Sequence, residues 1–343
     1  MSKKTTVLLL NLGTPKSPNV SDVRTYLFEF LNDRRVIDIP WLLRKILVNL
    51  IIVPFRAKGS SKIYQQLWTK DGSPLMIYGE KVKNLLQQEL DENFKVELAM
   101  RYQEPSMKRV LEKIRLDMPD KLIILPMYPQ YASSTTGSTF EKAMEIIRSW
   151  EVIPEIKLIN QFFDHEGYLN TIVDNANKHD LNEFDHFIFS YHGLPLRQVN
   201  KVHPNKNCKD CDCDKQFRPD TDYFCYRATC YETSKLLAEK LNIPKEKYTV
   251  AFQSRLDKNW LEPFSDKIVI EQAQKGAKKL MVFSPAFVAD CLETTIEIGM
   301  EYGELFEENG GKELVLVESL NDHPKWIATL KDLVINYNPK PLK

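Results

Sequence analysis

The sequence predicts an α/β protein with two similar doubly wound domains, each built on a four-stranded parallel sheet. Short apolar, β-branched runs alternate with longer helix-like stretches, which is the pattern of βα units around a parallel sheet. A chain of 343 residues also has about the length of two ordinary domains. We therefore expect one α/β domain over residues 1–165 and a second over residues 166–343.

Eight runs have the composition of buried strands, four in each half of the chain. They are expected near residues 6–11, 95–102, 122–127, 156–162, 186–191, 249–253, 280–284 and 313–318. The halves also resemble each other, because LLLNLGTP (8–15) has the same strand and turn pattern as FIFSYHGLP (187–195), and segment 122–147 matches 280–305. In such sheets ligands bind outside the carboxyl ends of the strands, so we search for the site there.

Charge and hydropathy exclude several classes of protein. Lys+Arg and Asp+Glu are both 47, and this balance gives no sign of the basic face that nucleic-acid binding needs. The N-terminal apolar run is short and is interrupted by Asn11 and Gly13, so a buried strand explains it better than a signal peptide does. No window reaches the roughly 18 apolar residues of a spanning helix. We expect a cytoplasmic protein.

The most apolar segment is 39–55, IPWLLRKILVNLIIVPF. Its bulky residues form one stripe, which in most helices indicates a core contact. Here prolines bracket the stripe and basic residues accompany it, which favours an interfacial helix lying on lipid or a lip where an apolar ligand enters. The stripe consists of Leu43, Leu47, Leu50 and Ile51, the prolines are Pro40 and Pro54, and the basic residues are Arg44, Lys45, Arg56 and Lys58.

His192 follows the apolar run of the fifth expected strand, and Gly193 and Pro195 turn the chain after it. This position places an imidazole at the mouth of the sheet crevice. Near neutral pH an imidazole takes up a proton or binds a borderline metal ion. The alternative is a histidine that only caps the turn, and position alone does not separate the two.

An acidic row follows the seventh expected strand. Glu293, Glu297 and Glu301 are spaced i, i+4, i+8 and share one helix face, with Asp290 just before them. Like charges at this spacing repel, and residues 289–305 contain no Lys or Arg. A helix start favoured by the dipole explains Asp290 and Glu293 but not the later two. The row predicts a path for protons leaving or for a hydrated divalent metal ion entering.

Five of the six cysteines fall within the polar insertion 199–230. A C-x2-C-x-C group with two more thiols nearby, in a cytoplasmic protein, indicates a metal site and not disulfides. Zinc is the generic occupant for such spacing. The five are Cys208, Cys211, Cys213, Cys225 and Cys230.

Seven motifs in this order resemble the ferrochelatase family over residues 7–334. They are LNLGTP (10–15), GSP (72–74), MRY (100–102), YPQYASSTTGS (128–138), SYHGLP (190–195), FQSRLDKNWLEP (252–263) and FSPAFVADCLET (283–294). The motif at 128–138 has neither the glycine and lysine pattern of a phosphate-binding loop nor a basic residue, which argues against nucleotide binding. The resemblance implies a class II chelatase-like fold and a lyase that inserts Fe(II) into protoporphyrin IX to form protohaem. Coproporphyrin III or another tetrapyrrole and metal is the alternative substrate, and a non-catalytic porphyrin or metal carrier is the alternative class.

The resemblance also implies roles for individual residues. His192 corresponds to the family's active-site histidine and Glu293 to its partner carboxylate, with Glu297 as a further catalytic residue and Glu301 continuing the acidic path. Metal contacts are expected from His192, Glu293, Asp290 and Glu301. Substrate contacts are expected from Leu12, Arg101, Tyr102, Ser134, Trp260 and Phe287, with Arg101 on the propionate side. The chain departs from the common pattern at Cys291, where many members have a histidine.

Some members of the resembled family carry a 2Fe-2S cluster, which four thiolates would suit. Cys208, Cys211, Cys213 and Cys225 are the first choice here, and Cys230 is the alternate. Zinc and unmetallated thiols remain the alternatives, and a cluster would be structural or a sensor. The expected partners are protoporphyrin IX, ferrous iron, the inner face of the cell membrane through 39–55, and the preceding porphyrin-producing oxidase.

Overall fold

The computed structural model describes residues 4–338, apart from 204–206 and 256. The described chain forms two compact units, residues 4–161 with 326–338, and residues 162–325. This differs from the expected domain limits in one element, because most of helix α13 (Pro324–Asn336) belongs to the first unit. Lys157 Nζ donates to the Val334 carbonyl at 3.2 Å, and the Tyr337 hydroxyl donates to Asn160 at 2.6 Å.

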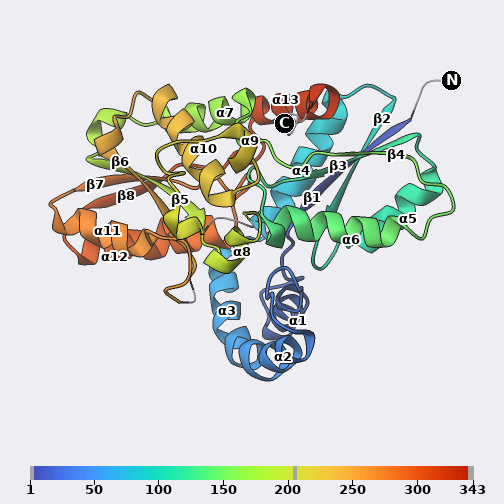
Figure 1. Ribbon diagram of the computed structural model, residues 1–343, viewed down its shortest axis with the longest axis horizontal. Helices are drawn as coiled ribbons and strands as arrows, with labels where there is room; N and C mark the ends of the chain where they lie inside the picture. The colour runs from blue at the N-terminus through green and yellow to red at the C-terminus, as the bar shows by residue number, and fades with distance from the viewer. Residues whose placement is uncertain (1–3, 204–206, 256, 339–343) are drawn as a thin grey trace. The chain divides into compact units, whose positions relative to one another are not determined.

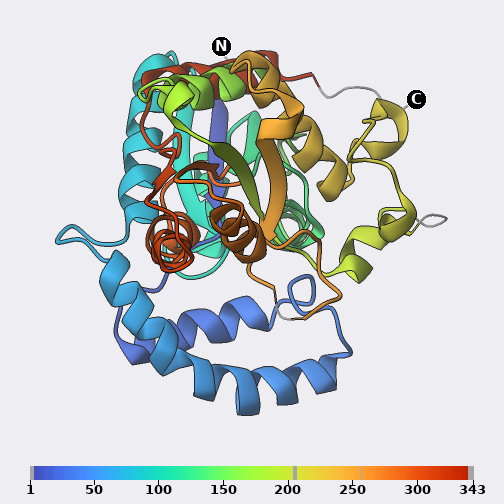
Figure 2. The same ribbon diagram turned by 90° about the vertical axis from the view of Figure 1, so that its left-hand side faces the viewer.

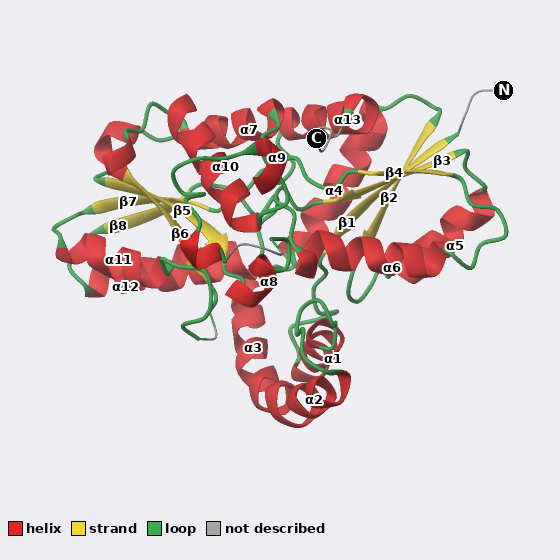
Figure 3. Ribbon diagram, viewed as in Figure 1, coloured by secondary structure: helices red, strands yellow, loops and turns green. Residues whose placement is uncertain are grey.

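The first unit contains a four-stranded, all-parallel sheet in the order β2-β1-β3-β4. The strands are β1 (Thr5–Asn11), β2 (Phe94–Met100), β3 (Lys121–Pro126) and β4 (Glu155–Leu158). Helices cover both faces of this sheet (Figure 3), which is the doubly wound arrangement that the sequence predicts. The helices are α1 (Val20–Leu31), α2 (Trp41–Ile46), η1 (Leu47–Ile52), α3 (Val53–Leu67), α4 (Pro74–Glu89), α5 (Met107–Asp117), η2 (Ser133–Gly137) and α6 (Ser138–Ile147).

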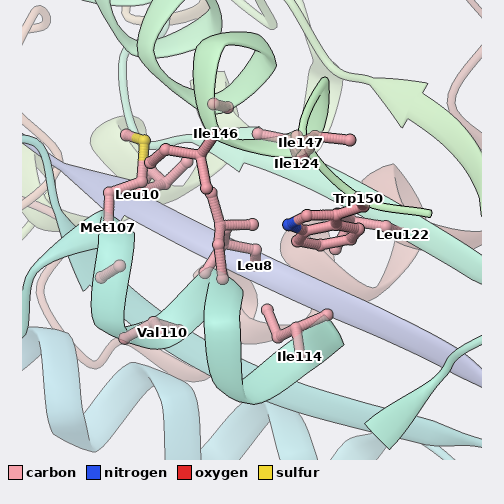
Figure 4. Packing of buried hydrophobic residues seen from close by; sticks show 13 residues of the cluster. Leu8, Leu10, Met107, Val110, Ile114, Leu122, Ile124, Ile146, Ile147 and Trp150 are labelled. Atoms are coloured by element: carbon pink, nitrogen blue, oxygen red, sulfur yellow. The ribbon is translucent and has the colours of Figure 1, made fainter. Parts of the chain in front are cut away.

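One face of this sheet packs on α5 and α6 (Figure 4). Leu8 and Leu10 of β1 and Ile124 of β3 are fully buried there, and Trp150 closes the layer after α6. Each such side chain contributes about 1.5–3 kcal/mol through burial. The strands are apolar on both faces because helices cover both, and this explains why they are continuous apolar runs in the sequence.

The second unit repeats this plan, with a parallel sheet in the order β6-β5-β7-β8. The strands are β5 (His186–His192), β6 (Tyr248–Gln253), β7 (Lys279–Phe283) and β8 (Glu313–Leu316). All eight predicted strands are therefore confirmed, and the order within each sheet is the same. The helices are α7 (Glu166–Ala176), η3 (Leu181–Glu183), α8 (Leu196–Asn200), η4 (Cys208–Asp210), α9 (Pro219–Asp222), α10 (Tyr226–Lys240), η5 (Lys245–Lys247), α11 (Ser265–Gln274), η6 (Leu292–Glu301) and α12 (Tyr302–Glu308).

The first strand of each unit ends in the same way. Leu12 and His192 are followed by Gly13 and Gly193, and neither glycine has room for a side chain. A Cβ on Gly193 would lie 2.6 Å from the Gln253 carbonyl oxygen, and one on Gly13, whose φ is +111°, would lie 1.9 Å from the Tyr102 carbonyl oxygen. The neighbouring strand approaches this closely in both units, so both turns require glycine.

The third strand of each unit leads into a π-helix, η2 in the first unit and η6 in the second. The sequence predicts an irregular loop before residue 138 in the first unit and an ordinary helix over residues 293–301 in the second. In both π-helices the hydrogen bonds span one more residue than in an α-helix. Such turns are rare and occur frequently at functional sites. Both follow the carboxyl end of a central strand, which is the position where this type of sheet binds ligands.

Helices α1, α2, η1 and α3 extend beyond the first sheet as a separate helical layer (Figures 1 and 2). Their inner side packs Val23, Val48, Val53 and Ala57 into one small core with Tyr102. Among the residues that the structure describes, none of the helices combines the length and the apolar composition needed to cross a bilayer.

Candidate active site

His192 is the last residue of β5 and lies half-buried at the carboxyl end of the sheet. Its Nδ1 atom is buried and has no hydrogen-bond partner among the described residues. Burial lowers the pKa of His192 below its ordinary 6.5, while the negative charge of Glu293 acts in the opposite direction. The imidazole is therefore neutral near pH 7 and able to accept a proton.

Two aromatic side chains surround the backbone at His192. The Tyr226 hydroxyl, from the start of α10, donates to the His192 carbonyl at 2.9 Å. Trp260 pairs its backbone with Pro195, and its ring lies 3.4 Å from the position of a Cβ on Gly193. The half-buried Trp260 ring is thus next to the turn that follows the imidazole. Phe287 is also half-buried, in the loop after β7.

The predicted acidic row lies on η6 and leads from the interior to the surface. Glu293 and Glu297 are half-buried, whereas Glu301 is exposed. The charge of Glu293 acts on both His192 and Glu297, so these three groups lie within electrostatic reach of one another. The structure thus brings the imidazole of β5 and the carboxylates after β7 together, as the adjacent strands require.

Glu297 has hydrogen-bond partners that sequence reasoning missed. The Ser254 hydroxyl lies 3.0 and 2.8 Å from its two carboxylate oxygens, and the Tyr302 hydroxyl lies 3.3 Å from one of them. Burial nevertheless raises the pKa of Glu297 to about 7. A carboxyl group with this pKa exchanges protons near neutral pH. Ser254 is part of the FQSR sequence, but nothing in the sequence indicated its partner.

The carboxylate of Asp290, predicted as a metal contact, is hydrogen-bonded to another side chain of the second unit. Asn321 Nδ2 donates to the Asp290 carboxylate at 2.8 Å, and the Asp290 backbone N–H donates to the Asn321 side-chain oxygen at 2.9 Å. This reciprocal pair joins the loop after β7 to the loop after β8. Asp290 therefore has a structural partner that the sequence did not reveal.

The residues predicted as metal contacts do not form a prepared metal site. Within residues 4–338, apart from the gaps given above, no group of three or more His, Cys, Asp or Glu side chains is arranged to hold a metal ion. His192 and Glu293 are close, Asp290 is bonded to Asn321, and Glu301 is exposed at the far end of η6.

The candidate residues of the first unit belong to a buried network around Asp33. The Asp33 carboxylate accepts hydrogen bonds from Arg101, from the Tyr102 hydroxyl and from the Ser138 hydroxyl, and also from the backbone N–H of Arg35. Arg101 and Tyr102 therefore have structural partners, and their contact with a substrate stays a prediction. Leu12 and Ser134 are half-buried and outside this network, and their contact with a substrate also stays a prediction.

A further cationic group in the first unit was missed. Arg34 and Arg35 both form ion pairs with Glu141 of α6, and Arg35 also donates to Ser133 at the start of η2 at 2.8 Å. The sequence DRR at 33–35 was the available signal, but its partners are about a hundred residues away.

The predicted cysteine site is assembled in part. The Sγ atoms of Cys211 and Cys213 are 3.0 Å apart, and Arg227 Nη1 lies 3.3 Å from Cys211 Sγ. Burial raises the pKa of Cys208 to about 12 and also raises that of Cys211, so these thiols are protonated unless a metal ion displaces the proton. The donor type fits a thiolate-bound metal, but no metal-binding group of three side chains is formed among the described residues.

Comparison with known proteins agrees with the geometry. The ferrochelatase family model matches residues 4–337. The chain belongs to the ferrochelatase family. It is 44% identical over 336 residues to the ferrochelatase of Coxiella burnetii (strain Dugway 5J108-111), covering 96% of this chain and 92% of the relative. It is 42% identical over 333 residues to that of Legionella pneumophila (strain Lens), covering 96% and 98%.

The fold is shared with other chelatases at low sequence identity. SirB from Bacillus subtilis with Fe3+ has a TM-score of 0.55 and 10% identity, covering 96% of this chain and 94% of the other. The sirohydrochlorin chelatase SirB from Bacillus subtilis subspecies spizizenii in complex with cobalt has a TM-score of 0.51 and 8% identity, covering 95% and 92%. The predicted class II chelatase fold and the resemblance to ferrochelatases, which are lyases that insert a metal into a porphyrin, are thereby confirmed.

Proposed function

We propose that this protein inserts Fe(II) into protoporphyrin IX to form protohaem. The observation that supports this most directly is the half-buried, neutral imidazole of His192 beside Glu293 in a chain of the ferrochelatase family. Metal insertion replaces two pyrrole protons by one ferrous ion, so a catalyst needs a base near the ring and a route for protons. His192 is the proposed base, since its pKa is lowered and its Nδ1 has no hydrogen-bond partner in the described part of the chain, which leaves it able to accept a proton.

The proposed proton route leads along η6. The negative charge of Glu293 acts to raise the pKa of His192, Glu297 has a pKa of about 7, and Glu301 is exposed to solvent. A proton passed from the imidazole along these carboxylates would reach water at the exposed Glu301. Glu293 and His192 are also the proposed contacts for incoming iron, while Asp290 is left out because Asn321 binds its carboxylate. Trp260 and Phe287 are proposed porphyrin contacts in this unit.

An anaerobic insertion assay tests the proposal. Purified protein is supplied with Fe(II) and either protoporphyrin IX or coproporphyrin III, and metalloporphyrin formation is followed by absorbance. We expect turnover with protoporphyrin, because the exposed apolar side chains of α2 and η1 favour the more hydrophobic porphyrin. Turnover with coproporphyrin alone would support the alternative substrate. Porphyrin binding without any turnover would support a carrier.

Replacing Glu297 by Gln is expected to stabilise the protein above neutral pH. In the folded state the Glu297 carboxyl group keeps its proton up to about pH 7, whereas an ordinary glutamate carboxyl group loses its proton near pH 4.5. Stability therefore falls as pH rises between these values, and the full cost, on the order of 3 kcal/mol, is present above pH 7. Gln has no proton to lose. Urea denaturation should show the variant more stable than wild type at pH 8 and nearly equal to it at pH 4.5.

Glu301→Gln is the matched control for this experiment, because Glu301 lies on the same helix but is exposed. A surface change of this kind alters stability by about 0.5 kcal/mol or less. A Glu297→Gln difference that does not vary with pH would contradict the assignment of a raised pKa.

We also propose that the segment 39–55 attaches the protein to the cytoplasmic face of the membrane. Leu50 and Phe55 are 68% and 81% exposed, and Trp41, Leu42 and Leu43 are more than half exposed. Arg44, one of the basic residues expected to face lipid headgroups, is buried instead and donates to the Ile37 and Ile39 carbonyls. The oxidase that produces the porphyrin is the proposed source of substrate at this surface.

Sedimentation with anionic lipid vesicles tests this attachment. Leu50→Glu with Phe55→Glu should weaken vesicle binding at least about tenfold, because each buried apolar side chain contributes about 1.5–3 kcal/mol. Leu116→Glu with Met118→Glu is the control, since these side chains are 72% and 76% exposed at the end of α5. Equal loss in both double variants would indicate a general charge effect and contradict the proposal.

Finally, we propose that the segment 208–230 holds a 2Fe-2S cluster, with zinc as the alternative. The support is the composition of the segment and the contact between Cys211 and Cys213. Anaerobically purified protein should show red-brown absorbance that dithionite bleaches, and Cys211→Ser should remove it while Cys291→Ser, outside the segment, retains it. A colourless protein that contains zinc would contradict the cluster.

A further inference from the structure

The loop between β7 and η6, residues 284–291, determines where the acidic helix begins. It has no regular hydrogen-bond ladder of its own, so its position depends on bonds from other parts of the second unit. At its first end the Tyr168 hydroxyl, from α7, donates to the Pro285 carbonyl at 2.6 Å. Tyr168 is fully buried. This contact holds one end of the loop against helix α7.

Asn321 holds the other end of the loop through three hydrogen bonds. Its backbone N–H donates to the Val288 carbonyl at 2.9 Å, its side-chain oxygen accepts from the Asp290 N–H at 2.9 Å, and its Nδ2 donates to the Asp290 carboxylate at 2.8 Å. The backbone of Asn321 has a positive φ of 48°, a conformation that Asn adopts more readily than most residues.

The loop that contains Asn321 is itself fixed to α7. Asn175 is buried, and its Nδ2 donates to the carbonyls of Glu318 and Ser319 at 3.1 Å each. Helix α7 therefore supports both loops, one through Tyr168 and the other through Asn175. Asn321 joins the two loops through its bonds to Asp290, which lies two residues before the start of η6.

We infer that Asn321 is a positioning residue for metal insertion, which acts through Asp290 to set the start of η6 and hence the direction of Glu293 toward His192. The inference rests on the proposed function and adds a residue that does not touch the reacting groups. Catalytic geometry is sensitive to this kind of support, since a shift of about 1 Å can cost 10²-fold in rate.

Three variants and one control test the inference in the full-length protein. Asn321→Ala removes the two side-chain bonds, and Asn321→Asp places two carboxylates against each other. The exchange Asp290→Asn with Asn321→Asp restores an amide and carboxylate pair with the direction of one bond reversed. Asn242→Ala is the control, because Asn242 also has a positive φ of 54° but is exposed at the end of α10.

We expect Asn321→Ala to lower kcat roughly 10- to 100-fold while KM for protoporphyrin changes less than about threefold. Asn321→Asp should be at least as slow. The exchange should return kcat to within about threefold of wild type, and Asn242→Ala should match wild type. Wild-type kcat in Asn321→Ala, or an exchange no faster than Asn321→Asp, would overturn the inference.

Amide hydrogen exchange gives a readout that does not need turnover. Asn321→Ala should raise exchange about tenfold or more in residues 286–297 and leave β5 and β6 unchanged. Unchanged exchange in 286–297 overturns the inference even if the protein proves to be no metal-insertion enzyme. An inactive wild type with the expected exchange pattern would count against the proposed function alone.

Discussion

His192→Ala is expected to lower kcat for iron insertion by about 10²- to 10⁴-fold, while porphyrin affinity stays within about tenfold of wild type. The variant removes the proposed base, whose Nδ1 has no hydrogen-bond partner among the described residues. The other imidazole of β5, His186, lies at the opposite end of that strand. Single-turnover absorbance and fluorescence quenching of protoporphyrin measure the rate and the affinity separately.

His186→Gln is the matched control, because both histidines belong to β5. His186 Nε2 lies 2.9 Å from the Thr249 hydroxyl, and the amide of Gln can replace that bond. We expect near wild-type turnover in this variant. Undiminished turnover in His192→Ala would remove His192 from the proposed mechanism, and loss of porphyrin binding would indicate a structural role.

Asp33→Ala is expected to destabilise the protein by about 3–5 kcal/mol, the typical cost of breaking a buried ion pair on one side. The side chains of Asp33 and Arg101 are 4% and 14% exposed, and Arg101 Nη2 lies 2.5 Å from Asp33 Oδ2. Burial alone would raise the pKa of Asp33, yet the Ser138 hydroxyl, the Arg35 N–H and the Arg101 charge together lower it below 3.8. Removing the carboxylate leaves the guanidinium, the Tyr102 hydroxyl and the Ser138 hydroxyl without their common acceptor.

Urea denaturation at pH 7 measures this effect. Glu104→Ala is the control, because the pair of Glu104 with Arg109 has side chains that are 65% and 69% exposed and is worth about 0–1 kcal/mol. Since the pKa of Asp33 is lowered in the folded state, its contribution is present above about pH 4 and is lost as pH falls through the folded value. Equal effects of the two substitutions would contradict the buried network.

The fold could be predicted because its strands are covered on both faces. Continuous apolar runs such as those of β1 and β5 have no other common explanation in a chain of this size, and their internal repetition fixed the number of units. Helix α13 groups with the first unit, which its sequence did not indicate, because its buried apolar face shows that the helix packs but not on which sheet.

The proximity of His192 and Glu293 could be predicted because adjacent parallel strands bring their carboxyl ends to one edge of the sheet. Their chemical roles stay predictions. Ser254 and Asn321 were missed because their roles depend on which loop they face, and the π-helical form of η6 was missed because no residue type specifies it.

The glycine turns at the ends of β1 and β5 have a consequence for how the two units differ. The same type of glycine turn occurs in both units, preceded by Leu12 in the first and by His192 in the second. The two units thus share a main-chain turn that admits no side chain at its glycine, while the residue before the glycine differs. The proposed base therefore depends on the side chain of a single residue in the second unit.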